Sequence, residues 1–404
     1  MKTIGYNMRL LLTLLLLSTK LFAQHDLSGI VLSSVDNSPL GYASVFINNS
    51  GKGTMAGVDG KFTIHGINEN EFELVASYSG FISVDIKINA ANLHQYQTIK
   101  LHPRTLNEIV IRRPDKDGWK NWGRMFTEYF IGTSDFASDC KIENPEVIRF
   151  FYDNKENILT AYSNDNIIVT NKALGYKVRY QLEDFSYDSR KRTVSFEGYT
   201  GFEDLIPRNK HNEVKWLKNR LESYRGSIMH FMRALYANNM ESEGFDVREK
   251  ITVHKTDSAW SQVCCDLMYK TARLDSTIFT IVPGPMDGFT KLPRYIDLIQ
   301  KSPISESKFC MFDSSSGQAV FYIANGLQVL YKNAYARSEY VKQTQQKYNS
   351  KFPQMSSVHL VTDSSILIQS NGNYYDPLNL VLDGYWGWCK LAETLPSDYV
   401  LETK

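Results

Sequence analysis

Short apolar runs separated by turn residues dominate the first hundred residues after the N-terminus. No helical period lies between these runs, so we predict strands at 27–32, 43–47, 61–64, 71–77, 82–88 and 97–101. Asp59-Gly60 is a tight-turn signal, and it predicts a hairpin between 53–58 and 61–64. Short strands at regular spacing indicate a β-sandwich over residues 24–103.

The pattern changes to a helical period after a linking segment at 104–117. Aromatic side chains recur at helical spacing: Trp119, Trp122, Phe126, Tyr129 and Phe130. Asp115 or Asp117 is the candidate N-cap of this helix, and Gly132 is the candidate C-terminal stop. We expect the aromatic stripe to pack into a core.

A second, larger region mixes strands with two short helical stripes. Strands are predicted at 147–152, 158–162, 166–170, 176–185 and 193–199. The first helical stripe is Val214, Leu217, Leu221 and Tyr224, with Asn212 as candidate N-cap. Gly226-Ser227 interrupts the helix, and the second stripe is Ile228, Phe231, Met232 and Leu235.

Strand patterns return after Phe245 and continue to the end of the chain. They lie at 251–254, 262–268, 277–282, 308–312, 319–323 and 327–331. Asn325-Gly326 predicts a hairpin between the last two strands, and Asn371-Gly372 predicts a further turn. We therefore expect a mainly β protein, a sandwich followed by an α+β domain of mostly antiparallel strands over 118–404.

The N-terminus has the pattern of a secretory signal peptide. Lys2 and Arg9 precede a leucine-rich run, and Ala23 stands at a plausible cleavage point. The apolar run is shorter than a membrane-spanning helix requires. We predict that residues 1–23 are removed, that the mature chain begins near Gln24 and has no transmembrane helix, and that the protein is exported.

Composition narrows the function classes further. The net charge is +1, so the chain has no basic excess for holding a nucleic-acid backbone. An exported chain can form disulfides, but five cysteines are too few for a disulfide framework: Cys140, Cys264, Cys265, Cys310 and Cys389. We expect most of them to be small buried residues, with room for one structural bridge.

Spaced elements of the first domain resemble the carboxypeptidase regulatory-like domain. They are Gly29-Ile30-Val31, the run 38–45, Gly53-Thr54, Asp59-Gly60-Lys61-Phe62 and Ser79-Gly80-Phe81. Ala56-Gly57 departs from the Thr-Asp that often stands there in the family. The resemblance implies a prealbumin-like sandwich of seven strands that acts as an accessory domain and is not itself the peptidase.

Parts of the second region resemble an uncharacterised domain that follows this module in exported Bacteroidetes proteins. The similar segments are 144–153, 170–185, 224–235 and 382–400. The connector 106–112 resembles the tail that often follows the module. It is either a strand that docks on a partner sheet or, as we favour, the last strand of the sandwich or an ordered linker. This resemblance implies a periplasmic or outer-membrane location and supplies no catalytic residues.

Motifs for established chemistry are missing from the sequence. No histidine has a glutamate three residues later, so the zinc motif of a carboxypeptidase is absent. Phosphate-loop, dinucleotide and nucleophile-elbow motifs are absent as well. We therefore predict no catalytic residues, no metal site and no cofactor.

Two segments are candidate ligand-binding sites. The first is the turn and helix start that carries Arg225, Ser227, His230 and Arg233, where backbone amides favour an anion or a glycan. The alternative, which we favour, is a serine cap with His230 and Arg233 on the solvent face. The second segment carries Tyr385, Trp386 and Trp388, aromatics that either stack on a ligand or build the core.

We expect a non-enzymatic binding or assembly module of the bacterial cell envelope, with an envelope protein or a glycan as its partner. The alternative is an envelope hydrolase acting on peptide or glycan, with an active site in 118–404. A deep cleft with converging acids or a Ser/His pair would favour the hydrolase.

Overall fold

The computed structural model describes residues 25–69, 71–89, 91–104, 114–163, 165–191, 193–254, 279–284, 294–313, 317–344 and 351–401. It divides into two compact units, one of Met1–Asn48 with Lys52–Val110 and the other of Asn49–Gly51 with Ile111–Lys404. The predicted signal peptide, the connector 106–112 and the pair Cys264-Cys265 lie outside the described residues, and the domain boundaries at 103 and 118 stay predictions.

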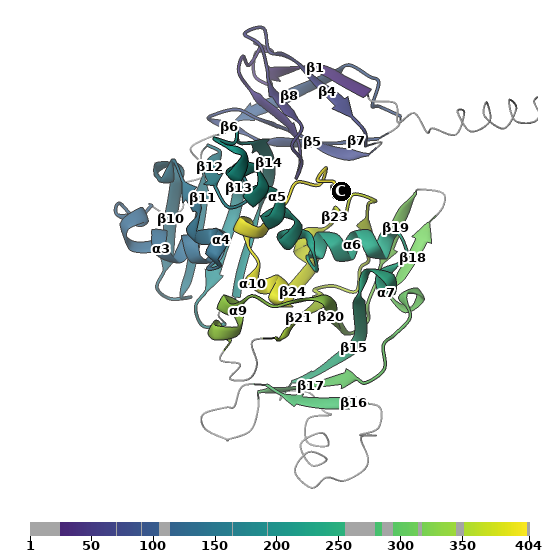
Figure 1. The fold of residues 1–404 in the computed structure, drawn as a ribbon. Coiled ribbons are helices and arrows are strands. Elements are labelled where there is room, and N and C mark those ends of the chain that lie inside the picture. Colours follow the sequence, from purple (N-terminus) through teal and green to yellow (C-terminus); the bar gives the residue numbers. More distant parts are fainter. Residues whose placement is uncertain are drawn as a thin grey trace, which may run out of the picture. The chain divides into compact units, whose positions relative to one another are not determined.

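The first unit is a sandwich of two four-stranded sheets (Figure 1). One sheet has the order β4 (Lys61–Ile67), β1 (His25–Ser33), β8 (Gln97–Pro103) and β6 (Phe81–Ile82). The other has the order β3 (Gly53–Met55), β2 (Ser44–Ile47), β5 (Phe72–Ser77) and β7 (Val84–Ile88). Alternate residues of β1 are buried, so its period of two fills the core as predicted.

Two local predictions for this unit are corrected by the pairing. The turn at Asp59-Gly60 exists, with Gly60 at φ 74, but it connects β3 and β4, which belong to different sheets. The predicted strand 82–88 is two strands, because β6 pairs with β8 while β7 pairs with β5. The described residues of the sandwich therefore form eight strands where seven were expected.

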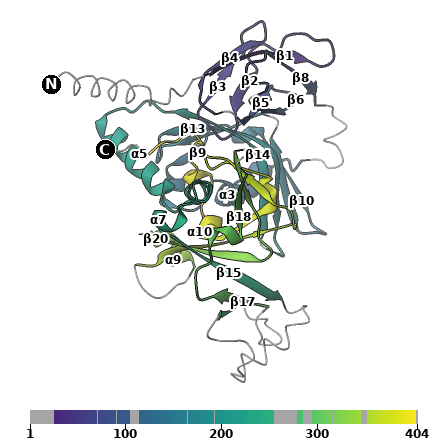
Figure 2. The same ribbon diagram turned by 90° about the vertical axis from the view of Figure 1, so that its right-hand side faces the viewer.

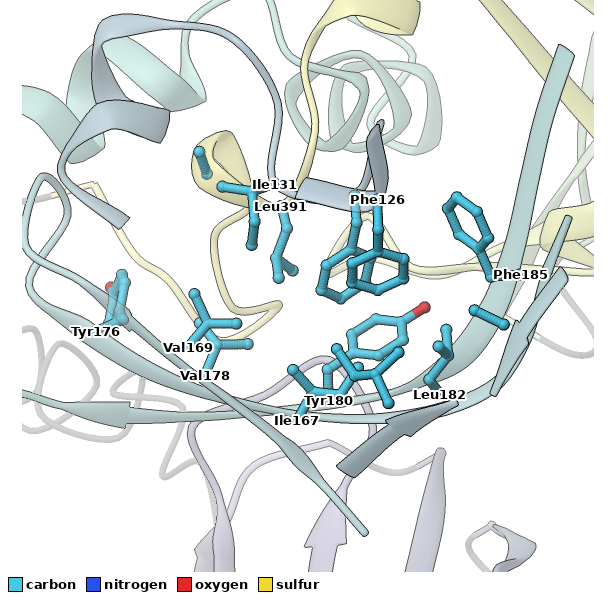
Figure 3. Packing of buried hydrophobic residues seen from close by; sticks show 14 of the residues in the cluster. Phe126, Ile131, Ile167, Val169, Tyr176, Val178, Tyr180, Leu182, Phe185 and Leu391 are labelled. Carbon is cyan, nitrogen blue, oxygen red and sulfur yellow. The ribbon is translucent and has the colours of Figure 1, made fainter. Parts of the chain in front are cut away.

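The second unit starts with α3 (Gly118–Phe130), which packs on an antiparallel sheet. The order in this sheet is β10 (Ile148–Asp153), β11 (Ile158–Ser163), β13 (Tyr176–Asp188), β12 (Ile167–Asn171) and β9 (Cys140–Ile142), with β14 (Thr193–Asp204) also paired to β13. Figure 3 shows Phe126 of α3 facing Tyr180 and Phe185 of β13. The aromatic stripe is thus core, as expected.

Neither of the two predicted N-cap residues, Asp115 and Asp117, caps α3 in the standard way. Asp117 occupies the N-cap position but makes no capping side-chain hydrogen bond. Asp115 instead accepts from the Asp117 amide and from the side chains of Asn121 and Trp122. Gly132 ends the helix region with φ 112, a conformation that favours glycine.

Two further antiparallel sheets complete the second unit (Figures 1 and 2). One has the order β16 (Phe279–Pro283), β17 (Tyr295–Gln300), β15 (Phe245–His254), β20 (Gly326–Tyr335), β21 (Pro353–Leu360) and β24 (Leu380–Gly384). The other has the order β18 (Cys310–Asp313), β19 (Gln318–Phe321), β22 (Ile366–Ile368) and β23 (Tyr374–Tyr375). The core between these two sheets includes Phe231 and Leu235, which lie on the helix Ile228–Tyr236.

Short helices connect and cover these sheets. They are α4 (Asp135–Ser138), α5 (Lys210–Tyr224), α6 (Ile228–Tyr236), α7 (Met240–Glu243), α9 (Ser338–Gln343) and α10 (Tyr385–Trp388). The N-cap of α5 is Asn209, not the predicted Asn212, because the Asn209 side chain accepts from the Asn212 amide. The mainly β, α+β fold class is confirmed.

The hairpin predicted at Asn325-Gly326 is wrong. Its two strands belong to different sheets: β19 pairs with β18 and β22, whereas β20 pairs with β15 and β21. The neighbours of β19 are the preceding strand β18 and the distant β22, and those of β20 are β15 and β21, so neither strand has an edge left for the other. The turn predicted at Asn371-Gly372 does exist, with Gly372 at φ 86 between β22 and β23.

Candidate functional site

The junction of α5 and α6 contains the first predicted site. Gly226 has φ 74, and a Cβ added there would meet the Gln354 side-chain oxygen at 2.0 Å, so only glycine fits. Ser227 caps α6, and its hydroxyl accepts from the His230 amide at 3.1 Å. Arg225 is exposed beside this turn.

His230 is 4% exposed, so the prediction that it faces solvent is wrong. Its Nδ1 accepts from the Gly226 amide at 3.1 Å, and its Nε2 lies 3.1 Å from a Glu243 oxygen. Because the amide must donate, Nδ1 carries no proton, and Nε2 donates to Glu243. Burial lowers the pKa of His230 more than Glu243 raises it, so the ring is neutral near pH 7.

Ser227, His230 and Glu243 lie close together, but they do not form a catalytic triad. In a triad one ring nitrogen accepts from the nucleophile and the other donates to the carboxylate. Here the accepting nitrogen takes the Gly226 amide, and the Ser227 hydroxyl serves as a helix cap. The three residues therefore stabilise the α5–α6 turn.

Arg233 binds the C-terminal segment. Its guanidinium donates to the backbone oxygens of Asn371 at 2.8 Å, Ser397 at 2.8 Å and Tyr399 at 3.0 Å. The placement on the solvent face is wrong for this residue too, because three carbonyls surround its donors. Those donors are occupied and do not face an anion.

The aromatic segment is brought to the same place by α10. Trp386 is buried, its indole nitrogen donates to the Gly226 oxygen at 2.7 Å, and its ring lies 5.1 Å from that of Phe231. Tyr385 is buried against Tyr340, and Trp388 donates to the Gln343 side chain at 2.9 Å. The fold thus joins both predicted segments through the contact of Trp386 with Gly226.

A buried ion pair was not anticipated from the sequence. Arg337 donates to Glu393 at 2.9 Å and to Glu222 at 3.1 Å, and both Arg337 and Glu393 side chains are buried. Ser134 and Ser223 also donate to Glu393. Burial raises the pKa of Glu393, and Arg337 opposes that shift. The sequence gives no signal for this pair, because Arg337 and Glu393 are far apart in the chain and neither belongs to a motif.

A hollow of about 500 Å³ lies beside β18 and the C-terminal end of α6. It is lined by Leu235, Tyr236, Asn238, Cys310 and Phe312. Burial raises the pKa of the Cys310 thiol to about 11, so this cysteine is a poor nucleophile. The hollow has the apolar and aromatic lining of a binding surface and no reactive group.

The first unit exposes large apolar side chains just before β2, on β3 and just after β3. Tyr42, Met55 and Val58 are each more than half exposed. Tyr42 has φ 66, which tyrosine rarely adopts, and its amide donates to the Ala56 oxygen at 3.0 Å. We call these three residues the Tyr42 surface.

The described residues offer neither a metal-binding cluster nor a disulfide. That part of the chain contains no cluster of three histidine, cysteine, aspartate or glutamate side chains that could hold a metal ion. Cys140, Cys310 and Cys389 are free thiols. None of the described helices is both long and apolar enough to cross a membrane.

Comparison with known proteins identifies the first unit. Residues 27–111 match the family model of the CarboxypepD_reg-like domain, and the first unit is such a domain. No curated protein matches the chain. Among solved structures, a 9R-lipoxygenase from Cyanothece PCC8801 is 11% identical, over 54% of this chain and 49% of that one, with a TM-score of 0.14. The chain thus spans about half of that protein, and so low a score carries no argument.

Proposed function

We propose that this chain is an exported, non-enzymatic binding or assembly protein of the bacterial cell envelope, in the periplasm or at the outer membrane. The observation that carries the proposal is the CarboxypepD_reg-like domain at 27–111. The sequence lacks the zinc motif of a carboxypeptidase, so the domain serves here as an accessory module. The resemblance of this domain and of the following region to exported Bacteroidetes proteins supports the proposal that the chain is a bacterial envelope protein.

Export is supported by the first 23 residues. A charged start, a leucine-rich run and Ala23 together form the pattern of a cleaved signal peptide. Cleavage leaves the sandwich near the new N-terminus, which is how an accessory module would be presented to an envelope partner.

Binding rather than catalysis is supported by the state of the polar side chains. Both ring nitrogens of His230 are occupied by the protein itself, and each of the three nitrogens of the Arg233 guanidinium donates to a backbone oxygen. The Tyr42 surface, in contrast, holds apolar side chains in solvent. Aromatic residues and methionine are enriched at protein interfaces.

Affinity capture from the native envelope tests the proposal. The bait is the full mature protein, and the matched variants are Tyr42→Asn, which suits the left-handed conformation, and Val35→Asn, another exposed site on the same unit. We expect an envelope protein or glycan that binds the wild type and Val35→Asn but is lost with Tyr42→Asn. Recovery of only the bait, or turnover of envelope peptides or glycans by the purified protein, would contradict it.

A further inference from the structure

β18 (Cys310–Asp313) is an edge strand at the rim of its sheet (Figure 1). Within the described part of the chain its one strand neighbour is β19, with Cys310 opposite Phe321 and Asp313 opposite Gln318. Among the described residues no strand is paired with the outer side of β18.

The hydrogen bonds of β18 show which backbone groups face outward. The Phe309 oxygen accepts from the Tyr322 amide, and the Asp313 oxygen accepts from the Gly317 amide. In an antiparallel pair alternate residues point toward the same neighbour, so Phe309, Met311 and Asp313 face β19. The amide and carbonyl groups of Cys310 and Phe312 consequently point away from the sheet.

The middle of this edge carries no charge, and the charges of Lys308 and Asp313 stand at its two ends. Exposed edges of natural sheets carry charges, prolines or bulges. Here the run Cys310-Met311-Phe312 is uncharged, and its register with β19 is regular. Met311 is 62% exposed and Phe312 is 56% exposed.

Side-chain direction distinguishes the two faces of the edge. Cys310 and Phe312 lie on the face that lines the hollow, together with Leu235 and Tyr236 of α6. The ring of Phe312 lies 5.4 Å from that of Tyr236. Met311 points to the opposite face, because successive residues of a strand alternate.

We infer that β18 pairs with β18 of a second copy of this chain, antiparallel, around a two-fold axis through Met311. In this register the outward amide and carbonyl of Cys310 form hydrogen bonds with those of Phe312 of the second copy. Phe312 forms the same bonds with Cys310 of the second copy. Met311 lies directly opposite Met311 of the second copy, and both become buried. Phe312 of the second copy lies across from Cys310, on the face where the hollow opens.

The charges at the two ends of the strand fit this arrangement. Lys308 precedes β18 and is exposed, and Asp313 ends it and is exposed. An antiparallel copy places the basic end of one strand next to the acidic end of the other. A parallel copy would bring like charges together, which disfavours it.

The inference concerns self-association and does not depend on export. The strand is short, so we expect a monomer–dimer equilibrium that shifts with concentration. The occupant is a second copy because the edge is complementary to itself in charge, hydrogen bonding and register. The test of this inference measures self-association of the purified chain, whereas the capture experiment detects a different partner molecule, so each can fail without the other.

Charge substitutions at Met311 test the pairing in the full mature chain. Met311→Lys and Met311→Glu each place like charges directly opposite one another across the axis, which opposes pairing. We expect sedimentation velocity to show dimer for the wild type at high concentration and monomer for each variant. An equal mixture of the two variants should form dimers again, because opposite charges then face each other. Val361→Lys, at an apolar residue that is 61% exposed and belongs to no proposed site, is the matched control and should remain dimeric.

Melting temperatures of all variants should match that of the wild type, since Met311 and Val361 are both exposed. A wild type that stays monomeric at every soluble concentration would overturn the inference. A dimer that persists in both single variants would overturn it as well, because that dimer would use another surface. Failure of the mixed variants to associate would exclude the register proposed.

Discussion

The buried state of His230 leads to a prediction that separates a structural histidine from a surface one. His230 and Phe231 are neighbours on α6, and both are buried, at 4% and 0% exposed. We compare His230→Ala and Phe231→Ala with Arg225→Ala, which changes an exposed residue at the same turn.

The magnitudes follow from the contacts. Phe231→Ala removes a ring that packs on Phe245 and Trp386 and leaves a cavity, at a cost of about 3–5 kcal/mol. His230→Ala leaves the Gly226 amide without its partner, which costs about 1–3 kcal/mol before any loss of packing. With the ring contacts included, we expect about 2–4 kcal/mol. Arg225→Ala should change stability by no more than about 0.5 kcal/mol.

The assay is urea unfolding followed by tryptophan fluorescence, repeated across pH. Burial lowers the pKa of His230 below the value of about 6.5 that it has when unfolded. As pH falls below that value the unfolded state takes up the proton first, so the unfolding free energy decreases. His230→Gln lacks this group, and the stability difference between wild type and His230→Gln should shrink as the solution is acidified.

Two results would refute this reasoning. A loss for His230→Ala as small as that for Arg225→Ala would mean that the ring is not packed as described. A stability difference between wild type and His230→Gln that is constant from neutral to acidic pH would mean that the pKa of His230 is not lowered. Either result would return the α5–α6 turn to consideration as a ligand site.

Three further predictions concern other parts of the chain. Glu393→Gln removes the buried carboxylate that faces Arg337 and leaves the arginine with the half-exposed Glu222, so it should cost about 3–5 kcal/mol. Glu222→Gln changes the half-exposed partner and should cost less than about 1 kcal/mol. Equal melting temperatures of these two variants would contradict this difference. Residues 24–103 contain a separate core, so the isolated segment should fold and give a β spectrum by circular dichroism, and a disordered spectrum would show that it needs the second unit. Protein from the envelope fraction should begin at or near Gln24 by N-terminal sequencing, and an intact Met1 or Met8 would argue against export.

Periodicity determined most elements because it reports which side of each segment is buried. β1 alternates between buried and exposed residues, and α3 buries Phe126 and Phe130, as the pattern predicts. The aromatic segment at 385–388 was expected either in the core or on a ligand, and Trp386 lies in the core. These features depend on neighbours within a few positions.

The pairing partners of the strands could not be predicted from the periodicity of single segments. Asn325-Gly326 has the composition of a hairpin turn, yet β19 and β20 join different sheets. β19 pairs with β22 and β20 pairs with β15, in each case tens of residues away, and turn composition contains no information about such distant partners. The same reason explains the turn at Asp59-Gly60, which is real but crosses between sheets.

The sequence by itself determined the fold class, the resemblance of the first domain to its family and the expectation of export, because these depend on local pattern and ordered motifs. Only the tertiary structure decided the roles of the polar residues. His230 is buried because Glu243 lies across from it, Arg233 is engaged because the C-terminal segment returns to it, and Arg337 is paired because Glu393 approaches it. Whether a charged side chain is solvated or paired depends on what the fold places beside it, and that contact is not encoded in any short stretch of chain.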